Sequence, residues 1–465
     1  MTPLSTLRSI NPATNSLLAE VDVMTEWEIE HSLTAVHRSY AGWKQVPLDE
    51  RCERVSALAA LLRRYAEETS LMMCNEMGKP IVQARAEIEK CAAACAYYAR
   101  EAASMLAPED LLANSHGADP ADFRSVRMEY EALGVVLAIM PWNFPYWQAI
   151  RAVVPAILAG NTVLLKPAPE VPLSAEMLQR LFDAAGLGNG IVCTLRATNE
   201  QTQQCIADKR VAAVTFTGST RGGKEVAAQA GRFLKKTVLE LGGSDAVCVC
   251  DDADISLAAS IAMRSRLVNS GQSCIAAKRC VVMREVADQF EQAVSREVLR
   301  AVTGDPKDET TTVGPLARRD LCDTLHEHVQ QSISQGARVL VDGGPTGAGC
   351  FFAPMVVSDI KPGMPMYEEE VFGPALAIII VDSEEEMIRV ANDTRYGLGA
   401  TVVSSDEQRA HRIAGALQAG VVFINDMVRS DVRFPFGGCK ESGWGRELGA
   451  HGIREFTNIK IVAAA

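Results

Sequence analysis

The sequence predicts an α/β protein with two lobes. Two series of short, β-branched segments alternate with helical segments, one series before residue 243 and one after it. Strands separated by helices of this length are typical of βαβ units and a parallel sheet. The chain has 465 residues, 48% of them hydrophobic, which is enough to bury large cores. We therefore expect two α/β domains that join near Gly242 and Gly243.

The first hundred residues have a helical pattern. Asp49 can cap a helix whose apolar positions recur at helical spacing, at Val55, Leu58, Ala59 and Leu62. A glycine at 78 and a proline at 80 predict that this helix ends there. A second helix is expected over 84–106. Apolar and charged residues then alternate over 124–131, which predicts a half-exposed strand pair suited to a subunit contact.

The two series of strands follow in order. The first has predicted strands at 135–139, 162–165, 191–195 and 212–217, with helices near 149–159, 174–185, 200–208 and 222–232. The second has predicted strands at 246–249, 280–283, 338–341, 376–381 and 421–424. The glycine-rich residues 343–349 predict a plain surface loop.

The composition argues against several classes of protein. The 46 basic and 58 acidic side chains give a net charge of −12, which disfavours binding to nucleic acid or anionic membranes. The longest apolar stretches are far shorter than the ~20 residues of a membrane helix, and the N-terminus does not resemble a targeting signal. Thirteen scattered cysteines indicate reduced thiols, so we expect a cytoplasmic protein.

Three motifs contain residues that can do chemistry. Residues 218–223 form a glycine-rich turn between a strand and a helix, which can bind a phosphate through its backbone amides or be an ordinary tight turn. Cys274 follows a small, polar, glycine-containing approach and is either an exposed nucleophile or a half-buried thiol. Glu240 precedes two glycines at a strand end and is either an activated base or a solvated terminus.

A rigid loop and a histidine pair complete the candidates. The loop Pro-Trp-Asn-Phe-Pro at 141–145 presents the amide of Asn143, either as an oxyanion donor or as part of a structural turn. His326 and His328 are two residues apart on a predicted helix and do not share a face, so no metal site is expected.

Taken together, these motifs resemble the aldehyde dehydrogenase superfamily over nearly the whole chain. The signatures occur in family order: PWNFP at 141–145, FTGST at 216–220, ELGG at 240–243, GQSC at 271–274, EEVFGP at 369–374 and PFGGCKESGWGRE at 435–447. The resemblance implies a two-lobed fold with a Rossmann-like NAD(P)-binding domain at 1–114 and 132–242 and a catalytic domain at 243–440. It also implies a small β oligomerisation element at 115–131 and 441–465, and a homodimer or homotetramer.

The resemblance implies oxidation of an aldehyde to a carboxylic acid through a cysteine thiohemiacetal and a thioester. Cys274 would attack the aldehyde, Asn143 and the Cys274 backbone amide would hold the oxyanion, and Glu240 would activate water. NAD or NADP would contact Trp142, Lys166, Gly218, Ser219, Gly223, Leu241, Glu370 and Phe372. Members selective for NAD usually carry Glu where this chain has Pro169, so NADP is expected to be tolerated unless the neighbouring Glu170 substitutes.

The substrate is predicted from fewer residues. Arg151 occupies a position where succinate-semialdehyde dehydrogenases carry an arginine for the substrate carboxylate, although it can instead be a surface charge. A second such arginine is replaced by Val268. Ser430 lies near a position that helps to bind the carboxylate, and Arg266, Arg429 or Arg433 can compensate. The sequence looks closest to the bacterial succinate-semialdehyde dehydrogenases. A CoA-acylating enzyme and a non-catalytic binding or structural member of the fold are the alternatives.

Overall fold

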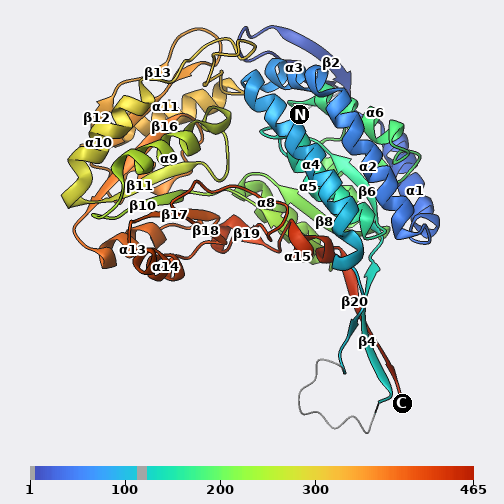
Figure 1. The fold of residues 1–465 in the computed structure, drawn as a ribbon. Coiled ribbons are helices and arrows are strands. Elements are labelled where there is room, and N and C mark those ends of the chain that lie inside the picture. Colours follow the sequence, from blue (N-terminus) through green and yellow to red (C-terminus); the bar gives the residue numbers. More distant parts are fainter. Residues whose placement is uncertain (1–5, 113–122) are drawn as a thin grey trace.

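The computed structural model describes residues 6–112 and 123–465, and it shows two lobes side by side with a β-ribbon that projects from them (Figure 1). Each lobe contains a twisted sheet covered by helices, as the predicted α/β class requires. None of the helices in these residues combines the length and the hydrophobicity that a membrane crossing requires.

The first lobe contains a six-stranded sheet within the described residues, in the order β19-β9-β8-β5-β6-β7. Its strands are β5 (Val135–Ile139), β6 (Thr162–Lys166), β7 (Val192–Thr194), β8 (Val211–Thr217), β9 (Lys236–Glu240) and β19 (Gly443–Trp444), all parallel except β19. β5 is apolar and fully buried, as expected of a central parallel strand.

The strand order reverses between β5 and β8, because β6 and β7 extend the sheet on one side and β9 on the other. Loops that leave the carboxyl ends of strands at such a switch point diverge and leave a crevice in which α/β proteins bind ligands. The loop at 141–145 and the turn at 218–223 leave β5 and β8 at this point. The topology therefore brings together two of the motifs found in the sequence.

Helices pack around this sheet. They are α1 (Glu26–Trp43), α2 (Leu48–Arg64), α3 (Ala66–Met77), α4 (Ile81–Met105), α5 (Pro145–Leu158), α6 (Pro172–Ala184), α7 (Asn199–Ala207), α8 (Thr220–Arg232) and α15 (Gly449–Glu455). Capping boxes stabilise the N-termini of two of these helices. In α1 the box is between Thr25 and Glu28, and in α7 it is between Thr198 and Gln201. Gly78 ends α3 in the left-handed conformation, with φ +74°, which glycine adopts most easily.

The second lobe contains a seven-stranded sheet in the described part of the chain, in the order β12-β15-β16-β11-β10-β17-β18. Its strands are β10 (Asp245–Val249), β11 (Ala277–Met283), β12 (Arg338–Val341), β15 (Met355–Ser358), β16 (Ala375–Val381), β17 (Gly399–Val403) and β18 (Val421–Ile424), all parallel except β12. Its helices are α9 (Ile255–Leu267), α10 (Arg284–Val298), α11 (Arg319–Ser334), α12 (Pro365–Glu368), α13 (Glu384–Asn392) and α14 (Glu407–Ala416), with short 3-10 turns η2 (Val268–Gly271) and η3 (Lys440–Ser442).

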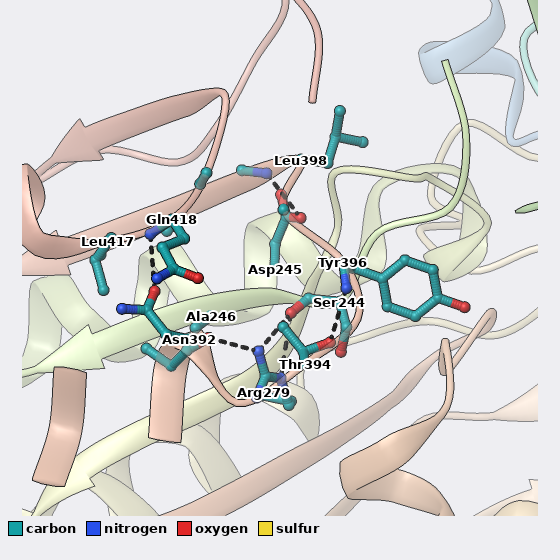
Figure 2. Close-up of a pocket in the computed structure, with 15 residues that line it drawn as sticks. Ser244, Asp245, Ala246, Arg279, Asn392, Thr394, Tyr396, Leu398, Leu417 and Gln418 are labelled. Atoms are coloured by element: carbon teal, nitrogen blue, oxygen red, sulfur yellow. Dashed lines mark hydrogen bonds between the residues drawn. The ribbon is translucent and has the colours of Figure 1, made fainter. Parts of the chain in front are cut away.

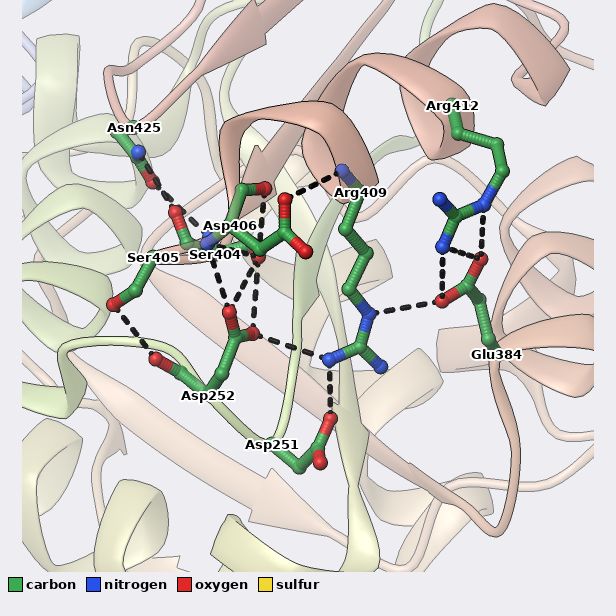
Figure 3. Close-up of polar contacts among 9 residues, drawn as sticks. All are labelled: Asp251, Asp252, Glu384, Ser404, Ser405, Asp406, Arg409, Arg412 and Asn425. Atoms are coloured by element: carbon green, nitrogen blue, oxygen red, sulfur yellow. Dashed lines mark hydrogen bonds and ion pairs between the residues drawn. The ribbon is translucent and has the colours of Figure 1, made fainter.

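A network of ion pairs fixes α13 and α14 to the end of β10 (Figure 3). Arg409 on α14 contacts Asp251 at 2.6 Å and Glu384, at the start of α13, at 2.9 Å. Glu384 also pairs with Arg412, and the neighbouring Asp252 accepts hydrogen bonds from Ser404. Because Arg409 is largely buried and shared among several carboxylates, this network contributes more than isolated surface pairs do.

The projecting ribbon is a small antiparallel sheet. The C-terminal strand β20 (Thr457–Ala464) pairs along its length with β4 (Ser125–Ala132), and β4 pairs with β3 (Glu109–Asp110). The predicted strand at 124–131 therefore lies against the C-terminal part of the expected oligomerisation element. Residues 113–122, within the predicted oligomerisation element, lie outside the described part of the chain.

Several sequence predictions of local structure were wrong. Asp49 does not cap a helix, because α2 begins at Leu48 after Pro47. The predicted long helix is interrupted at Tyr65, which separates α2 from α3, and the next helix begins at Ile81 rather than 84. A hairpin of β1 (Thr6–Ile10) and β2 (Leu17–Asp22) precedes these helices. Within the expected loop at 343–349, β13 (Gly344–Pro345) pairs with β14 (Phe352–Ala353).

Candidate active site

A cavity of 170 Å³ brings together Cys274, Arg151 and Ser430, which are far apart in the sequence. Cys274 follows η2, Arg151 lies on α5, and Ser430 lies in the segment after β18. Lys90 on α4 and Arg429 also line this cavity, and Trp147 and Phe436 supply aromatic walls. A concave site with a thiol and several cations is a reasonable place for a small anionic ligand.

The turn before Cys274 has an unusual backbone. Asn269, Ser270 and Gly271 have φ values of +53°, +55° and +78° in succession. Side chains rarely adopt this left-handed conformation, and its cost is typical of functional sites held by their surroundings. Here Asn269 Nδ2 donates to the carbonyl oxygens of Asn143 at 2.7 Å and Gln272 at 3.2 Å.

The Cys274 side chain is half-buried. Burial raises the pKa of its thiol to about 11, and the cations of Arg151 and Lys278 offset only part of this effect. Lys278 donates to the carbonyl oxygens of Ser273 at 2.9 Å and of Cys274 at 2.5 Å. A thiol with this pKa is protonated at neutral pH, so nucleophilic attack requires a base.

Glu240 has the character of such a base. It ends β9, is 2% exposed, and neither of its carboxylate oxygens accepts a hydrogen bond from the residues that the structure describes. Burial, followed by the nearby carboxylate of Glu447, raises its pKa well above the usual range. Glu240 also contributes to the raised pKa of Cys274, so the two groups share one electrostatic environment. The alternative of a solvated strand terminus is wrong.

Arg151 is not a surface charge, because it is 2% exposed. Its Nε forms a buried ion pair with Glu447, and its guanidinium lies 5.0 Å from the Phe436 ring centroid. Glu447 was not among the predicted site residues, although it lies in the last family signature. Burial raises the pKa of Glu447, and Arg151 lowers it in part. A strong cation is therefore shared between two buried carboxylates, Glu240 and Glu447.

Two sets of contacts hold the loop that contains Asn143 in place. The Nδ2 of the buried Asn143 donates to the carbonyl of Gln272 at 3.1 Å, which places this amide beside the turn that carries Cys274. Glu87 accepts hydrogen bonds from the amides of Tyr146 and Trp147, the first turn of α5, and forms a buried ion pair with Lys79. A carboxylate at a helix N-terminus accepts hydrogen bonds from the free backbone amides and interacts favourably with the helix dipole.

The residues expected to bind a cofactor gather at the strand-order reversal. Ser219 caps α8 by accepting from the Gly222 amide at 3.2 Å, and the Gly218 amide donates to the Glu240 carbonyl at 3.0 Å. A Cβ at Gly223 would come within 2.4 Å of the Leu241 side chain, so a larger residue there requires Leu241 or the start of α8 to shift. The start of α8 thus has the geometry of an anion site.

Two other predicted cofactor residues, Phe372 and Glu370, contact the first lobe or the residues that join the lobes. The rings of Trp142 and Phe372 meet edge to face, with centroids 5.9 Å apart. Glu370 accepts from the Gly243 amide at 3.2 Å and lies 3.6 Å from Lys278.

Lys166 ends β6 and is almost buried, and this burial lowers its pKa. Glu170 does not substitute freely for the missing carboxylate at position 169, because it pairs with Arg318 at 2.7 Å.

The three arginines expected to compensate for Val268 lie in different environments. Arg266 is fully buried and donates to the Gly271 carbonyl. Arg433 pairs with Asp431 at 2.6 Å, and Arg429 pairs with Asp426. Of the three, only Arg429 lines the cavity, where Val268 presents an apolar wall. Lys90 was not among the predicted site residues, because a single lysine on an alanine-rich helix carries no such signal.

A second cavity lies at the N-terminal ends of β10 and β17 and is only 20 Å³, room for about one water (Figure 2). Arg279 donates there to the carbonyl oxygens of Ser244 and Ala391, each at 3.0 Å, and to that of Val390 at 3.0 Å. Asp245 accepts from the Gly399 amide at 3.1 Å. This cavity is a structural junction, and the cavity with Cys274 is the candidate active site.

Comparison with known proteins agrees with this geometry. The sequence profile of the aldehyde dehydrogenase family matches residues 2–462. The succinate semialdehyde dehydrogenase [NAD(P)+] Sad of Escherichia coli (strain K12) is 43% identical, covering 99% of this chain and 98% of that protein. The succinate-semialdehyde dehydrogenase [NADP(+)] 1 of Mycobacterium bovis (strain BCG / Pasteur 1173P2) is 41% identical, with 98% and 99% coverage.

A solved structure shares both fold and sequence. Succinic semialdehyde dehydrogenase from Streptococcus pyogenes, in complex with NADP+, superposes with a TM-score of 0.94 at 36% identity, covering 98% of this chain and 99% of that one. The fold, the full-length profile match and these identities agree, and this chain belongs to the aldehyde dehydrogenase family.

Proposed function

We propose that this protein oxidises succinate semialdehyde to succinate with NAD or NADP as hydride acceptor. Relatives about 40% identical over nearly the whole chain carry this activity in their names. The observation that carries the proposal is the placement of Cys274 in a cavity lined by cations, within electrostatic reach of the buried carboxylate of Glu240, which accepts no hydrogen bond from the described residues. A dicarboxylate product fits a site with both a nucleophile and a basic wall.

The residues support the following chemistry. The Cys274 sulfur bonds to the aldehyde carbon while its proton passes to a base, for which Glu240 is the nearby candidate. The Asn143 amide and the Cys274 backbone N–H stabilise the oxyanion. After loss of hydride the carbon is held as a thioester, and Glu240 removes a proton from the water that hydrolyses it. The products are the free acid and the regenerated thiol.

The crevice fits a nicotinamide dinucleotide, which when bound supplies the hydride acceptor. The capped start of α8, with its close approach to β9 at Gly223, offers backbone donors to a pyrophosphate. Lys166 and Glu370 would bind ribose hydroxyls, and Trp142, Phe372 and Leu241 would give apolar walls. Because Pro169 leaves no carboxylate to repel a 2′-phosphate and Glu170 is paired with Arg318, the proposal includes NADP.

We propose a homodimer or homotetramer in the cytoplasm. The exposed β20 edge favours association of subunits, and the thirteen free cysteines favour a reducing compartment.

The proposal is tested by steady-state kcat/KM for succinate semialdehyde and for uncharged butyraldehyde, with NAD and with NADP. We expect a strong preference for the charged aldehyde, activity with both cofactors, and no turnover in Cys274→Ala. Equal use of the two aldehydes would contradict the substrate, and equal inactivity of wild type and Cys274→Ala would favour a non-catalytic member of the fold.

The product distinguishes the remaining alternative. Adding coenzyme A and assaying for acyl-CoA and free acid is expected to yield the free acid, because a water-activating Glu240 would be wasteful in an acyl transferase. Acyl-CoA as the main product would reverse this conclusion.

A further inference from the structure

We infer that Lys90, together with Ser430, is the group that binds the carboxylate of the substrate. This inference rests on the proposed function and adds to it the residue that selects a charged aldehyde. Three cations line the cavity with Cys274, namely Lys90, Arg151 and Arg429. The cation that gains most from a substrate carboxylate is one that is buried and has no carboxylate partner within the protein.

Two of the three already have carboxylate partners. Arg151 forms its buried ion pair with Glu447 and also interacts with Glu240. Arg429 is exposed and pairs with Asp426. A charge that is already paired has less to gain from a second carboxylate, and an exposed one is screened by water.

Lys90 has no carboxylate within ion-pair distance among the described residues. Its Nζ donates to Ser430 Oγ at 2.7 Å and lies 4.2 Å from the centroid of the Trp147 ring. An ammonium in such a place is costly unless a counter-ion accompanies it. It has three hydrogens, of which Ser430 takes one, so donors remain for a ligand in the cavity.

Ser430 completes the pair. It is 7% exposed and accepts from Lys90, so its own hydroxyl hydrogen is available to a carboxylate oxygen. The two donors come from α4 and from the segment after β18, 340 residues apart, and meet on the wall of the cavity that holds Cys274. An aldehyde with a terminal carboxylate can therefore present one end to the thiol and the other to this pair.

The surroundings of Lys90 make the pair sensitive to pH. Burial and then the neighbouring Arg151 lower the pKa of Lys90 to about 8, while Cys91, Glu87 and Asp431 act weakly in the opposite direction. The ammonium is thus present at pH 7 and largely lost at pH 9. Preference for a charged substrate should fall about tenfold between these values, since the cationic fraction falls about tenfold per pH unit above the pKa.

The test measures the ratio of kcat/KM for succinate semialdehyde to kcat/KM for butyraldehyde. Chemical steps common to both substrates, including ionisation of Cys274 and Glu240, cancel in this ratio. We expect Lys90→Met to lower the ratio on the order of 100-fold and Ser430→Ala to lower it by a smaller factor. Lys90→Arg should keep much of the preference and remove its decline between pH 7 and pH 9, because guanidinium does not titrate there.

Arg429→Met is the matched control, because it removes an equal charge from the same cavity. Its ratio should change less than threefold. Arg151 is a poorer test, since its loss would leave Glu447 buried and unpaired. Binding of succinate to each variant, measured by calorimetry, gives a second readout that does not depend on turnover.

The outcomes separate this inference from the proposed function. If wild type prefers succinate semialdehyde and Lys90→Met has the same ratio and the same succinate affinity, the proposed function stands and the assignment of Lys90 is wrong. If wild type shows no preference, the substrate itself has been misidentified. A larger effect of Arg429→Met than of Lys90→Met would also overturn the inference.

Discussion

Glu240 illustrates how a single buried side chain connects stability with function. Burial and the carboxylate of Glu447 raise its pKa, so the fold favours the neutral acid. The reaction needs the carboxylate, which becomes available only as the pH rises. The ionised form of Glu240, which the reaction requires, therefore destabilises the folded protein at the pH at which the enzyme works.

Replacing Glu240 by Gln tests this account, because the amide keeps the shape and cannot ionise. Since the pKa in the folded state is above the unfolded value, wild type loses stability as the pH rises from about 4.5, and the variant does not. We expect Glu240→Gln to be more stable by about 1–3 kcal/mol at pH 8.5 and by less at pH 5.5. Calorimetric melting at both pH values measures this.

The same variant should lower steady turnover by about 10²–10⁴-fold. Because Glu240 is the proposed base for both the attack of Cys274 and the hydrolysis of the thioester, formation of NAD(P)H in a single turnover should slow as well, measured by stopped-flow absorbance. A variant that is less stable at both pH values, or that turns over normally, would contradict the role given to Glu240.

At the scale of elements, the contact between α8 and β9 fixes both the start of α8 and the position of Glu240. Gly223 allows this contact, because a Cβ there would come within 2.4 Å of Leu241. The same Leu241 is held from the other side, where its amide donates to the Ser442 carbonyl at 3.0 Å. A larger residue at Gly223 therefore requires the Leu241 side chain or the start of α8 to move.

We expect Gly223→Ala to raise KM for the cofactor on the order of tenfold, because the amides at the start of α8 shift. KM for the aldehyde at saturating cofactor should change less. Gly231→Ala on the same helix is the control: nothing lies within 4 Å of its Cβ, so it should raise the melting temperature and leave both KM values unchanged. Equal effects of the two substitutions on KM would show that the contact at Gly223 is irrelevant.

The sequence predicted some elements better than others for physical reasons. Strands that are apolar on both faces were found, and β5 lies at the predicted residues. The strands β15 and β17 were missed because they are short and contain serine or glycine. The break at Tyr65 was missed because no glycine or proline marks it.

In the site, motifs identified Cys274, Glu240 and Asn143 as candidates. They did not reveal Lys90 or Glu447, because the pairings of these residues depend on contacts across the fold.

At the scale of the whole molecule, the ribbon that projects from the body has an edge strand to which another chain could bind (Figure 1). β20 lies at the edge of its sheet and pairs with β4 on one side only, among the described residues. Ile459 and Ile461 are 60% and 52% exposed on this strand. An exposed, apolar edge strand of this kind tends to associate with another chain.

We therefore expect the wild-type protein to have a mass in solution of two or four times the 50.1 kDa chain, measured by light scattering after size exclusion. Substituting lysine at both Ile459 and Ile461 places two charges on the exposed strand and should release the 50.1 kDa subunit. Lys460→Gln is the control on the alternate face, where Lys460 pairs with Glu131. A wild-type protein that is monomeric at micromolar concentration, or a double variant with the wild-type mass, would show that the ribbon does not join subunits. Because β4 and β20 contribute no residue to the lining of the cavity, released subunits should also keep the preference for charged aldehydes that we ascribe to Lys90.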